Sequence, residues 1–203
     1  MSAATLSGAP RAVIFGKLPS HGDFVYRGLG DAARAAWDEW ASAGLAEADA
    51  ELGEGFEAAH DTAPPWCFIS GPGLLGEGWR VGAFAPSADS AGRRFVIVVA
   101  IDDLSLADAV LLGPRTAAAL IEAFYRMFSA RLSADEALEI VAGCAQETGG
   151  AKAAALGCLL TAREQGVWWP HIGADAEQVC TGAVPARDLL LRALRLLQGD
   201  AAA

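Results

Sequence analysis

The chain has 203 residues, of which 53% are hydrophobic and 20% charged, and its 15 basic and 25 acidic side chains give a formal net charge of −10 at pH 7. This composition is sufficient for one sizeable buried core. A surface so acidic repels phosphate backbones and anionic lipid, so we expect neither nucleic acid nor a membrane surface as a partner.

The sequence carries no signal for export or membrane insertion. Residues 1–10 lack the basic and apolar regions of a signal peptide, and the strongly apolar run at residues 96–101 is far too short to cross a bilayer. The four cysteines are widely spaced and form no C-x-x-C pair, which favours reduced, mostly buried thiols over a metal or redox centre. We therefore expect a cytoplasmic protein without stable membrane insertion.

Apolar and β-branched runs bounded by glycine, proline and polar residues predict the strands. They lie at residues 11–15, 66–70, 79–85, 95–101 and 167–169. The run at residues 95–101 does not alternate with polar residues, so we expect a central strand covered on both faces. Gly16 ends the first run, and residues 16–23 contain too much glycine and proline for regular structure, which predicts a loop.

Periodic apolar residues and capping signals predict the helices. Asp31 is a candidate N-cap of a helix that extends to about residue 52, and residues 53–65 are expected to form a connection. Pro114 should begin a fresh helix, separate from a shorter one that starts at Ser105.

The second half contains two more helix starts. Ser133, followed three residues later by Glu136, has the pattern of a capping box, and Pro185 should open a final helix. Residues 146–165 are rich in alanine and glycine, which leaves both a helix and a mobile loop open.

The order of these elements predicts the fold class. Strands come early, helices stand on either side of them, and neither an internal repeat nor a long linker divides the chain. We expect a flexible N-terminus at residues 1–10 and a single domain at residues 11–200. Its fold should be α/β (α+β), a three-layer α-β-α sandwich around a mixed, largely antiparallel sheet.

Residues 71–76 match the G-x-G-x-x-G pattern of dinucleotide-binding loops. Such a loop must open a helix whose N-terminus holds the pyrophosphate. The residues that follow it, 79–85, predict a strand instead, so we interpret the glycines as a hairpin connection and expect no cofactor.

A metal-dependent hydrolase that uses Asp23, Asp89 or Asp102 with His21 is the enzymatic alternative. Asp102 and Asp103 follow the long apolar run, at the place where many α/β enzymes carry metal ligands. The sequence contains no histidine pair with ligand spacing, and neighbouring acids at a strand end are common turn residues. We therefore favour a polar strand exit in which one aspartate caps the next helix.

Six tryptophans are unusual in a chain of this length. Trp37 and Trp66 are expected in the core, where large aromatics contribute most. Trp168 and Trp169 are adjacent, and neighbouring strand residues point to opposite faces, so one ring should look outward unless a helix covers it. An outward ring there would be a candidate interface anchor.

Three segments form an ordered set of motifs. Residues 15–25 read F-G-K-L-P-S-H-G-D-F-V, residues 37–40 read W-D-E-W, and residues 86–95 read P-S-A-D-S-A-G-R-R-F. The set resembles the G-K-L-P-x-x-G-D-F, W-D-x-W and P-S-x-D-x-x-G-R-x-F motifs of the TagF family (also called ImpM) of type VI secretion-associated proteins. The resemblance is close over residues 13–101 and looser beyond them.

The resemblance implies a compact α/β sandwich in the cytoplasm, without known catalytic activity. It also implies a role in restraining assembly or firing of the secretion apparatus after translation, with the forkhead-associated (FHA-domain) protein of the same system as partner. A structural subunit of another envelope complex is a further possibility.

The candidate partner-contact or motif residues are Gly16, Lys17, Pro19, His21, Gly22, Asp23, Phe24, Asp89, Gly92, Arg93, Trp168 and Trp169. We expect the loop at residues 16–23 to present Lys17, His21 and Asp23 to solvent. The alternative is that Asp23, or Asp89 with Arg93, only ties loops together by hydrogen bonds and an ion pair.

Overall fold

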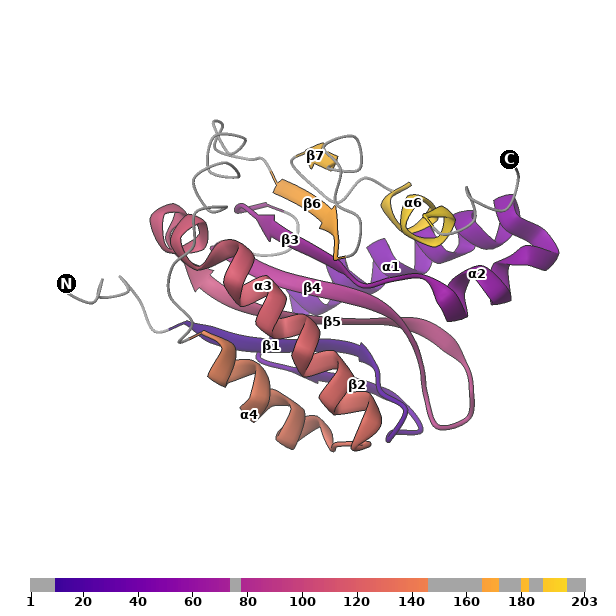
Figure 1. The fold of residues 1–203 in the computed structure, drawn as a ribbon, viewed down its shortest axis with the longest axis horizontal. Helices are drawn as coiled ribbons and strands as arrows, with labels where there is room; N and C mark the ends of the chain where they lie inside the picture. Colours follow the sequence, from indigo (N-terminus) through magenta and orange to yellow (C-terminus); the bar gives the residue numbers. More distant parts are fainter. Residues whose placement is uncertain (1–9, 74–77, 146–165, 172–179, 183–187, 197–203) are drawn as a thin grey trace.

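A computed structural model describes residues 10–73, 78–145, 166–171, 180–182 and 188–196 (Figure 1). The strands are β1 (Arg11–Lys17), β2 (Phe24–Arg27), β3 (Trp66–Ser70), β4 (Trp79–Ala88), β5 (Arg94–Leu104), β6 (Gly166–Pro170) and β7 (Cys180–Gly182). They form one 7-stranded sheet in the order β2-β1-β5-β4-β3-β6-β7. Every described strand pair is antiparallel, so the expectation of a mixed sheet is wrong for this part of the chain.

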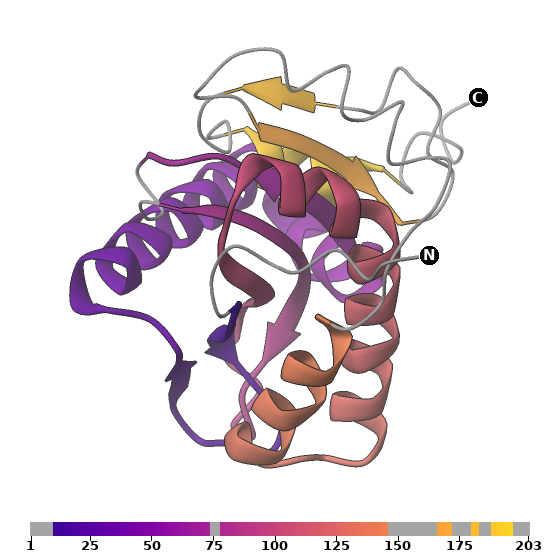
Figure 2. The same ribbon diagram turned by 90° about the vertical axis from the view of Figure 1, so that its left-hand side faces the viewer.

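The helices cover both faces of this sheet (Figure 2). They are α1 (Asp31–Leu52), the 3-10 turn η1 (Gly53–Gly55), α2 (Phe56–Thr62), α3 (Leu106–Ser129), α4 (Ala134–Cys144) and α6 (Leu189–Arg195). One core contains α3 and α4 with one face of the sheet, and a second core contains α1 and α6 with the other. The three-layer α-β-α sandwich predicted from the sequence is therefore confirmed.

The central strand β5 explains why the sequence pattern predicted this architecture. Val96 and Val98 face α1 and α6, whereas Ile97 and Val99 face α3 and α4, and all four side chains are buried. A strand covered on both faces needs an unbroken apolar run, as residues 95–101 indicate.

The prediction of two helices divided at Pro114 is wrong, because α3 is a single helix from Leu106 to Ser129. Proline inside a helix removes one backbone hydrogen bond and bends the axis without necessarily ending the helix. Figure 2 shows the axis of α3 changing direction between its shorter first part and its longer second part. A Cβ at the preceding Gly113 would lie 2.9 Å from Ile69 Cδ1, so glycine lets this part of the helix lie directly on β3.

Helix α2 was also missed, because seven residues are too few to show a helical period in the predicted connection at residues 53–65. At α1, Gly30 occupies the N-cap and Asp31 is the first helical residue. The capping box is confirmed: the Ser133 hydroxyl accepts from the Glu136 N–H, and the Glu136 carboxylate accepts from the Ser133 N–H at 2.9 Å. Hydrogen bonds from the Ser133 side chain and then its backbone lower the pKa of Glu136.

The tryptophans test the core assignment. Trp37 and Trp66 are buried, as expected. Trp168 is 1% exposed and stacks on Phe68 with 4.8 Å between ring centroids, so it is not the outward ring of the Trp168–Trp169 pair. Trp169 is partly buried against the α3 and α4 core, because both faces of β6 are covered.

None of the helices in the described ranges combines the length and the apolar character needed to cross a bilayer. The start of the last helix at Pro185 and the segment at residues 146–165 lie outside the described residues.

We expect Trp37→Ala to lower the free energy of unfolding by ~3–5 kcal/mol, because it removes a fully buried ring from the α1 core. Urea unfolding measures the loss. Tyr125→Ala is the control: its ring is 50% exposed, so its cost should stay within about 0.5 kcal/mol. Equal midpoints for the two variants would contradict the core position of Trp37.

Candidate functional site

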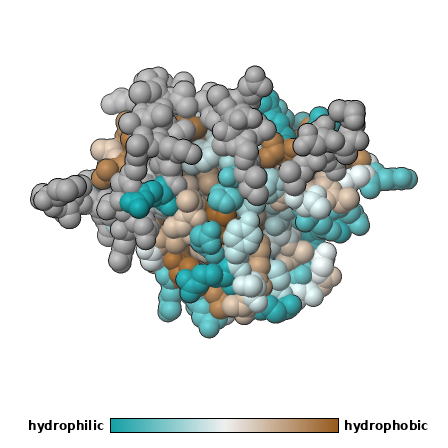
Figure 3. Space-filling view, in the orientation of Figure 1, coloured by the Kyte–Doolittle hydropathy of each residue, from teal (hydrophilic) through white to brown (hydrophobic). Residues whose placement is uncertain are grey.

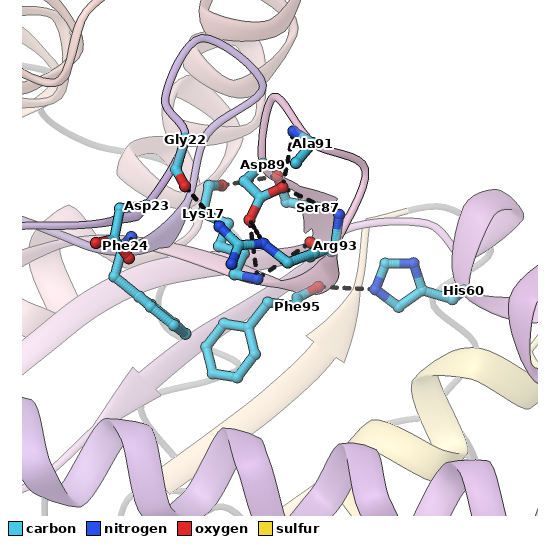
Figure 4. A network of polar contacts seen from close by, with 10 residues as sticks. All are labelled: Lys17, Gly22, Asp23, Phe24, His60, Ser87, Asp89, Ala91, Arg93 and Phe95. Atoms are coloured by element: carbon cyan, nitrogen blue, oxygen red, sulfur yellow. Dashed lines mark hydrogen bonds and ion pairs between the residues drawn. The ribbon is translucent and has the colours of Figure 1, made fainter.

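Two of the motifs converge at one end of the sheet, where the end of β1 and the loop at residues 18–23 meet the hairpin between β4 and β5 (Figure 4). Asp89 lies at the centre of this site. Its Oδ1 accepts hydrogen bonds from the backbone N–H groups of Ala91 and Arg93, both at 3.0 Å. Its Oδ2 lies 2.7 Å from Arg93 Nε and 3.1 Å from Lys17 Nζ.

The side chain of Asp89 is fully buried, and yet its carboxylate is ionised. Burial alone would raise its pKa, but the hydrogen bonds from the Arg93 N–H, the Lys17 ammonium and the Arg93 guanidinium hold the pKa well below its usual range. Both carboxylate oxygens are therefore occupied by donors that belong to the chain itself.

Lys17 is the last residue of β1 and is 7% exposed, so the expectation that a loop presents it to solvent is wrong. Its ammonium also donates to the Arg93 carbonyl at 3.3 Å and lies 5.1 Å from the centroid of the Phe24 ring. Its own carbonyl accepts a 2.7 Å hydrogen bond from the Ser87 hydroxyl. The strand continues two residues past the predicted end because Lys17 finds a buried countercharge in Asp89.

Gly16 explains the glycine of the first motif. It lies within β1 with φ +124°, and a Cβ there would stand 2.0 Å from the Val96 carbonyl oxygen. Gly92, with φ +78°, allows the tight turn of the hairpin. Gly22 is different, since a Cβ there would meet only the Ser90 Oγ at 3.5 Å. The space around Gly22 therefore does not require a glycine there.

The hairpin holds the loop at residues 18–23 from one side. Arg93 Nη2 donates to the Gly22 carbonyl at 2.6 Å, and the Ser90 N–H donates to the His21 carbonyl at 2.7 Å.

The turn between α3 and α4 holds the same loop from the other side. Arg131 Nη2 donates to the Pro19 carbonyl at 2.8 Å, and the Ser20 hydroxyl donates to the Leu132 carbonyl at 2.6 Å. Ser20 Oγ also lies 2.9 Å from His21 Nδ1. The loop is thus fixed by contacts with two neighbouring turns.

Some candidate residues do remain accessible above this network. We call His21, Gly22, Asp23, Ser90 and Ala91 the hairpin–loop surface; His21 is half-buried and the other four are exposed. Asp23 Oδ1 accepts from the Phe24 N–H at 2.8 Å.

The arrangement does not build the hydrolase site. Asp102 pairs with Arg11, at the opposite end of β1 from Lys17 and Asp89, about 20 Å away at the rise of an antiparallel strand. Asp102 Oδ1 also accepts from buried Arg80 at 3.1 Å. Asp89 and Asp102 therefore do not converge, and the described residues contain no group of three or more His, Cys, Asp and Glu placed to hold a metal.

The interpretation of one aspartate as a helix cap is wrong, because both Asp102 and Asp103 lie within β5. Ser105 caps α3 instead, accepting from the Asp108 N–H at 3.1 Å. Asp103 has φ +61° and pairs with Arg11 at 3.2 Å.

Sequence reasoning gave no sign of the structural contact made by His60, which lies in the unpredicted helix α2. It is 3% exposed and its Nε2 donates to the Phe95 carbonyl at 2.7 Å, which ties α2 to the start of β5 (Figure 4). Next to it, Arg94 makes two hydrogen bonds to Asp61, at 2.9 and 2.8 Å, and these lower the pKa of Asp61. A single histidine in a seven-residue helix gave no signal for this contact.

A groove of about 550 Å³ runs beside the site, between α2, β4 and α3, and its lining includes Pro19, Ser87 and the exposed ring of Tyr125. Figure 3 shows the face on the α3 side, where the coloured apolar residues form small, separate patches among polar ones. Of the described thiols, Cys67 and Cys144 are both buried, and burial raises the pKa of Cys67 to about 12, which makes it a poor nucleophile. Cys158 and the side chain of Cys180 lie outside what the structure describes.

Fold and site together define a three-layer α+β domain whose motif residues lock two turns beneath an exposed surface. Residues 13–147 match the family described as the TagF N-terminal domain, type VI secretion system-associated, and the chain belongs to this family. Among solved structures, it is similar to PA0076 from Pseudomonas aeruginosa PAO1, with a TM-score of 0.74 and 23% identity over 91% of this chain and 94% of that one, which supports the fold. A comparison with curated proteins gives no match.

We expect Gly16→Ala to destabilise the protein by more than about 2 kcal/mol, because its Cβ would collide with the β5 backbone. Gly22→Ala is the matched control and should cost less than about 1 kcal/mol. Thermal and urea unfolding of both variants measure the difference. Equal losses would mean that the strand can shift to admit a side chain at Gly16.

Acid should weaken the fold through Asp89. Its pKa in the folded protein lies below that of an unfolded aspartate, about 3.9, so its contribution to stability is fully present above about pH 4 and is lost as the pH falls below that value. We expect Asp89→Asn to be less stable at pH 7 and to lose less further stability between about pH 4 and 3 than the wild type. Urea unfolding across this range provides the measurement, with the exposed Asp31→Asn as control. Parallel stability curves for wild type and Asp89→Asn would contradict this assignment.

Proposed function

We propose that the protein is a non-enzymatic cytoplasmic accessory factor that negatively regulates the type VI secretion system after translation. It does so by binding another protein, the FHA-domain protein of the same system, through the hairpin–loop surface. Membership of the type VI secretion-associated TagF family supports the assignment to this secretion system, and the geometry of the site supports a binding role.

The observation that carries the proposal is the Lys17–Asp89–Arg93 network, in which buried Lys17 and Asp89 lie beneath this surface and Arg93 reaches it. It holds the loop carrying His21 and Gly22 and the hairpin carrying Ser90 in fixed positions through backbone hydrogen bonds. A surface that is ordered before binding loses little conformational entropy when a partner docks.

The same network argues against a catalytic use of these groups. The Asp89 oxygens already accept four hydrogen bonds or ion pairs from Ala91, Arg93 and Lys17, so this carboxylate has no oxygen left for a substrate or metal. The role of Lys17 and Asp89 is to position the surface.

Ala91→Arg tests the surface directly, because it places a long charged side chain on an exposed position of the hairpin whose backbone bonds it leaves in place. We expect at least tenfold weaker binding to the purified FHA-domain protein, about 1.4 kcal/mol, with an unchanged melting temperature. The matched control is Ala46→Arg, which is also at an exposed position, on α1. Calorimetry gives the affinity, and secretion should rise in cells that carry Ala91→Arg.

Three results would contradict the proposal in different ways. Absence of binding by the wild-type protein removes the FHA-domain protein as partner. Equal binding by Ala91→Arg and Ala46→Arg places the interface elsewhere. Wild-type secretion in cells with Ala91→Arg, despite weakened binding, separates this contact from the regulatory role.

A further inference from the structure

The strand β2 forms one edge of the sheet, next to the hairpin–loop surface. Among the described strands it pairs with β1 alone, with Gly16 opposite Val25 and Ile14 opposite Arg27. A strand edge carries backbone N–H and C=O groups that can pair with another chain.

The contacts identify which backbone groups of β2 point outward. In an antiparallel pair, alternate residues bond to the neighbour and the others face away. The Lys17 carbonyl bonds to Ser87 and the Phe24 N–H bonds to Asp23, so Lys17 and Phe24 do not bond to each other. Phe24 and Tyr26 therefore present their backbone groups to the open edge.

Phe24 and Tyr26 together have four outward backbone groups, one N–H and one carbonyl each. Side chains of the protein already cap two of them. Asp23 Oδ1 accepts from the Phe24 N–H at 2.8 Å, and Arg27 Nη1 donates to the Tyr26 carbonyl at 2.9 Å. Arg27 is itself held by Asp135 of α4 at 2.7 Å. The Tyr26 N–H and the Phe24 carbonyl are the outward groups that remain for a partner.

The side chains of the same two residues are exposed aromatics in fixed positions. Phe24 is 41% and Tyr26 45% exposed. The Phe24 ring stands edge-on against Phe95 with 4.8 Å between centroids, and the Arg34 guanidinium lies 4.7 Å from the Tyr26 centroid. Ordered aromatic rings at an open edge are typical anchors of protein interfaces.

We propose that β2 accepts an extended, basic segment of a partner protein as an additional strand of the sheet. The segment would bond to the Tyr26 N–H and the Phe24 carbonyl and pack its side chains on the two aromatic rings. The inference rests on the proposed function in taking the FHA-domain protein as the carrier of this segment.

The charge of the protein favours a basic partner segment over a second copy of the chain as the strand that pairs with β2. The carboxylates along the edge are Asp23, Asp31 and Asp135, and the side chains of the last two are 97% and 77% exposed. Asp31 and Asp135 each contact one arginine, Arg34 at 3.5 Å and Arg27 at 2.7 Å, so their charges are partly compensated. Two copies that each carry a net charge of −10 repel one another, whereas lysine or arginine side chains on an incoming strand meet these carboxylates.

Tyr26→Pro is the test, because proline removes the free outward N–H while a sheet edge tolerates it. Tyr26→Phe is the matched control, since it keeps both the N–H and the ring. With the purified FHA-domain protein, we expect at least tenfold weaker binding by Tyr26→Pro and binding within about twofold of wild type by Tyr26→Phe. Arg27→Ala, which frees the Tyr26 carbonyl, should bind at least as tightly as wild type.

Hydrogen exchange on the wild-type protein gives a second readout that does not depend on the folding of a variant. The Tyr26 amide should become protected at least tenfold when the FHA-domain protein is added, and protection should also appear on a lysine- or arginine-rich segment of that protein.

Binding by Tyr26→Pro equal to that of Tyr26→Phe, or an unprotected Tyr26 amide in the complex, overturns the strand addition and leaves the proposed function intact. A complete lack of binding by the wild type overturns both. A homodimer of the isolated chain that Tyr26→Pro dissolves would identify a second copy as the occupant and overturn the proposal of a basic partner segment.

Discussion

The buried carboxylate of Asp89 is the constraint from which the rest of the site follows. An ionised group inside a protein is very costly unless donors of its own chain surround it. Here the donors come from the end of β1, through Lys17, and from the hairpin after β4, through Ala91 and Arg93. Because these segments are far apart in the sequence, satisfying one carboxylate fixes the end of the sheet and both of its turns.

The same constraint separates the motif residues into interior and exterior groups. Lys17 and Asp89 neutralise each other out of contact with water, so they have no charge to offer a partner. Arg93 connects the interior group to the exterior one, because its Nε donates to Asp89 inside and its Nη2 donates to the Gly22 carbonyl at the surface. In the proposed function, a partner would therefore meet the backbone and side chains of the hairpin–loop surface and not Lys17 or Asp89. Of the charged motif residues, Lys17 and Asp89 are thus internal, whereas Asp23 and Arg93 reach the surface.

The sequence predicted the layers better than it predicted the site. A strand buried on both faces needs an unbroken apolar run, so the predicted ranges of β3, β4 and β5 lie close to those in the structure. Burial could not be predicted from residue type where a partner distant in the sequence determines it. Lys17 has its countercharge 72 positions away, and Trp168 has a stacking partner on β3. The prediction of a new helix at Pro114 failed because it used only local sequence. It could not take into account how closely Gly113 lets α3 pack on Ile69.

The first motif can be followed from the core to the outside in the order of its residues. Gly16 permits a backbone contact between β1 and β5, Lys17 fills the interior charge pair, and Gly22 is held through its carbonyl. Asp23 and Phe24 then lie at the open edge of the sheet, where the carboxylate covers a backbone N–H. A side chain that caps an edge donor limits indiscriminate strand pairing, while the Tyr26 N–H and the Phe24 carbonyl stay available at the same edge. The first motif therefore combines a rigid support with a sheet edge that is partly capped, and this combination is what the proposed strand addition requires.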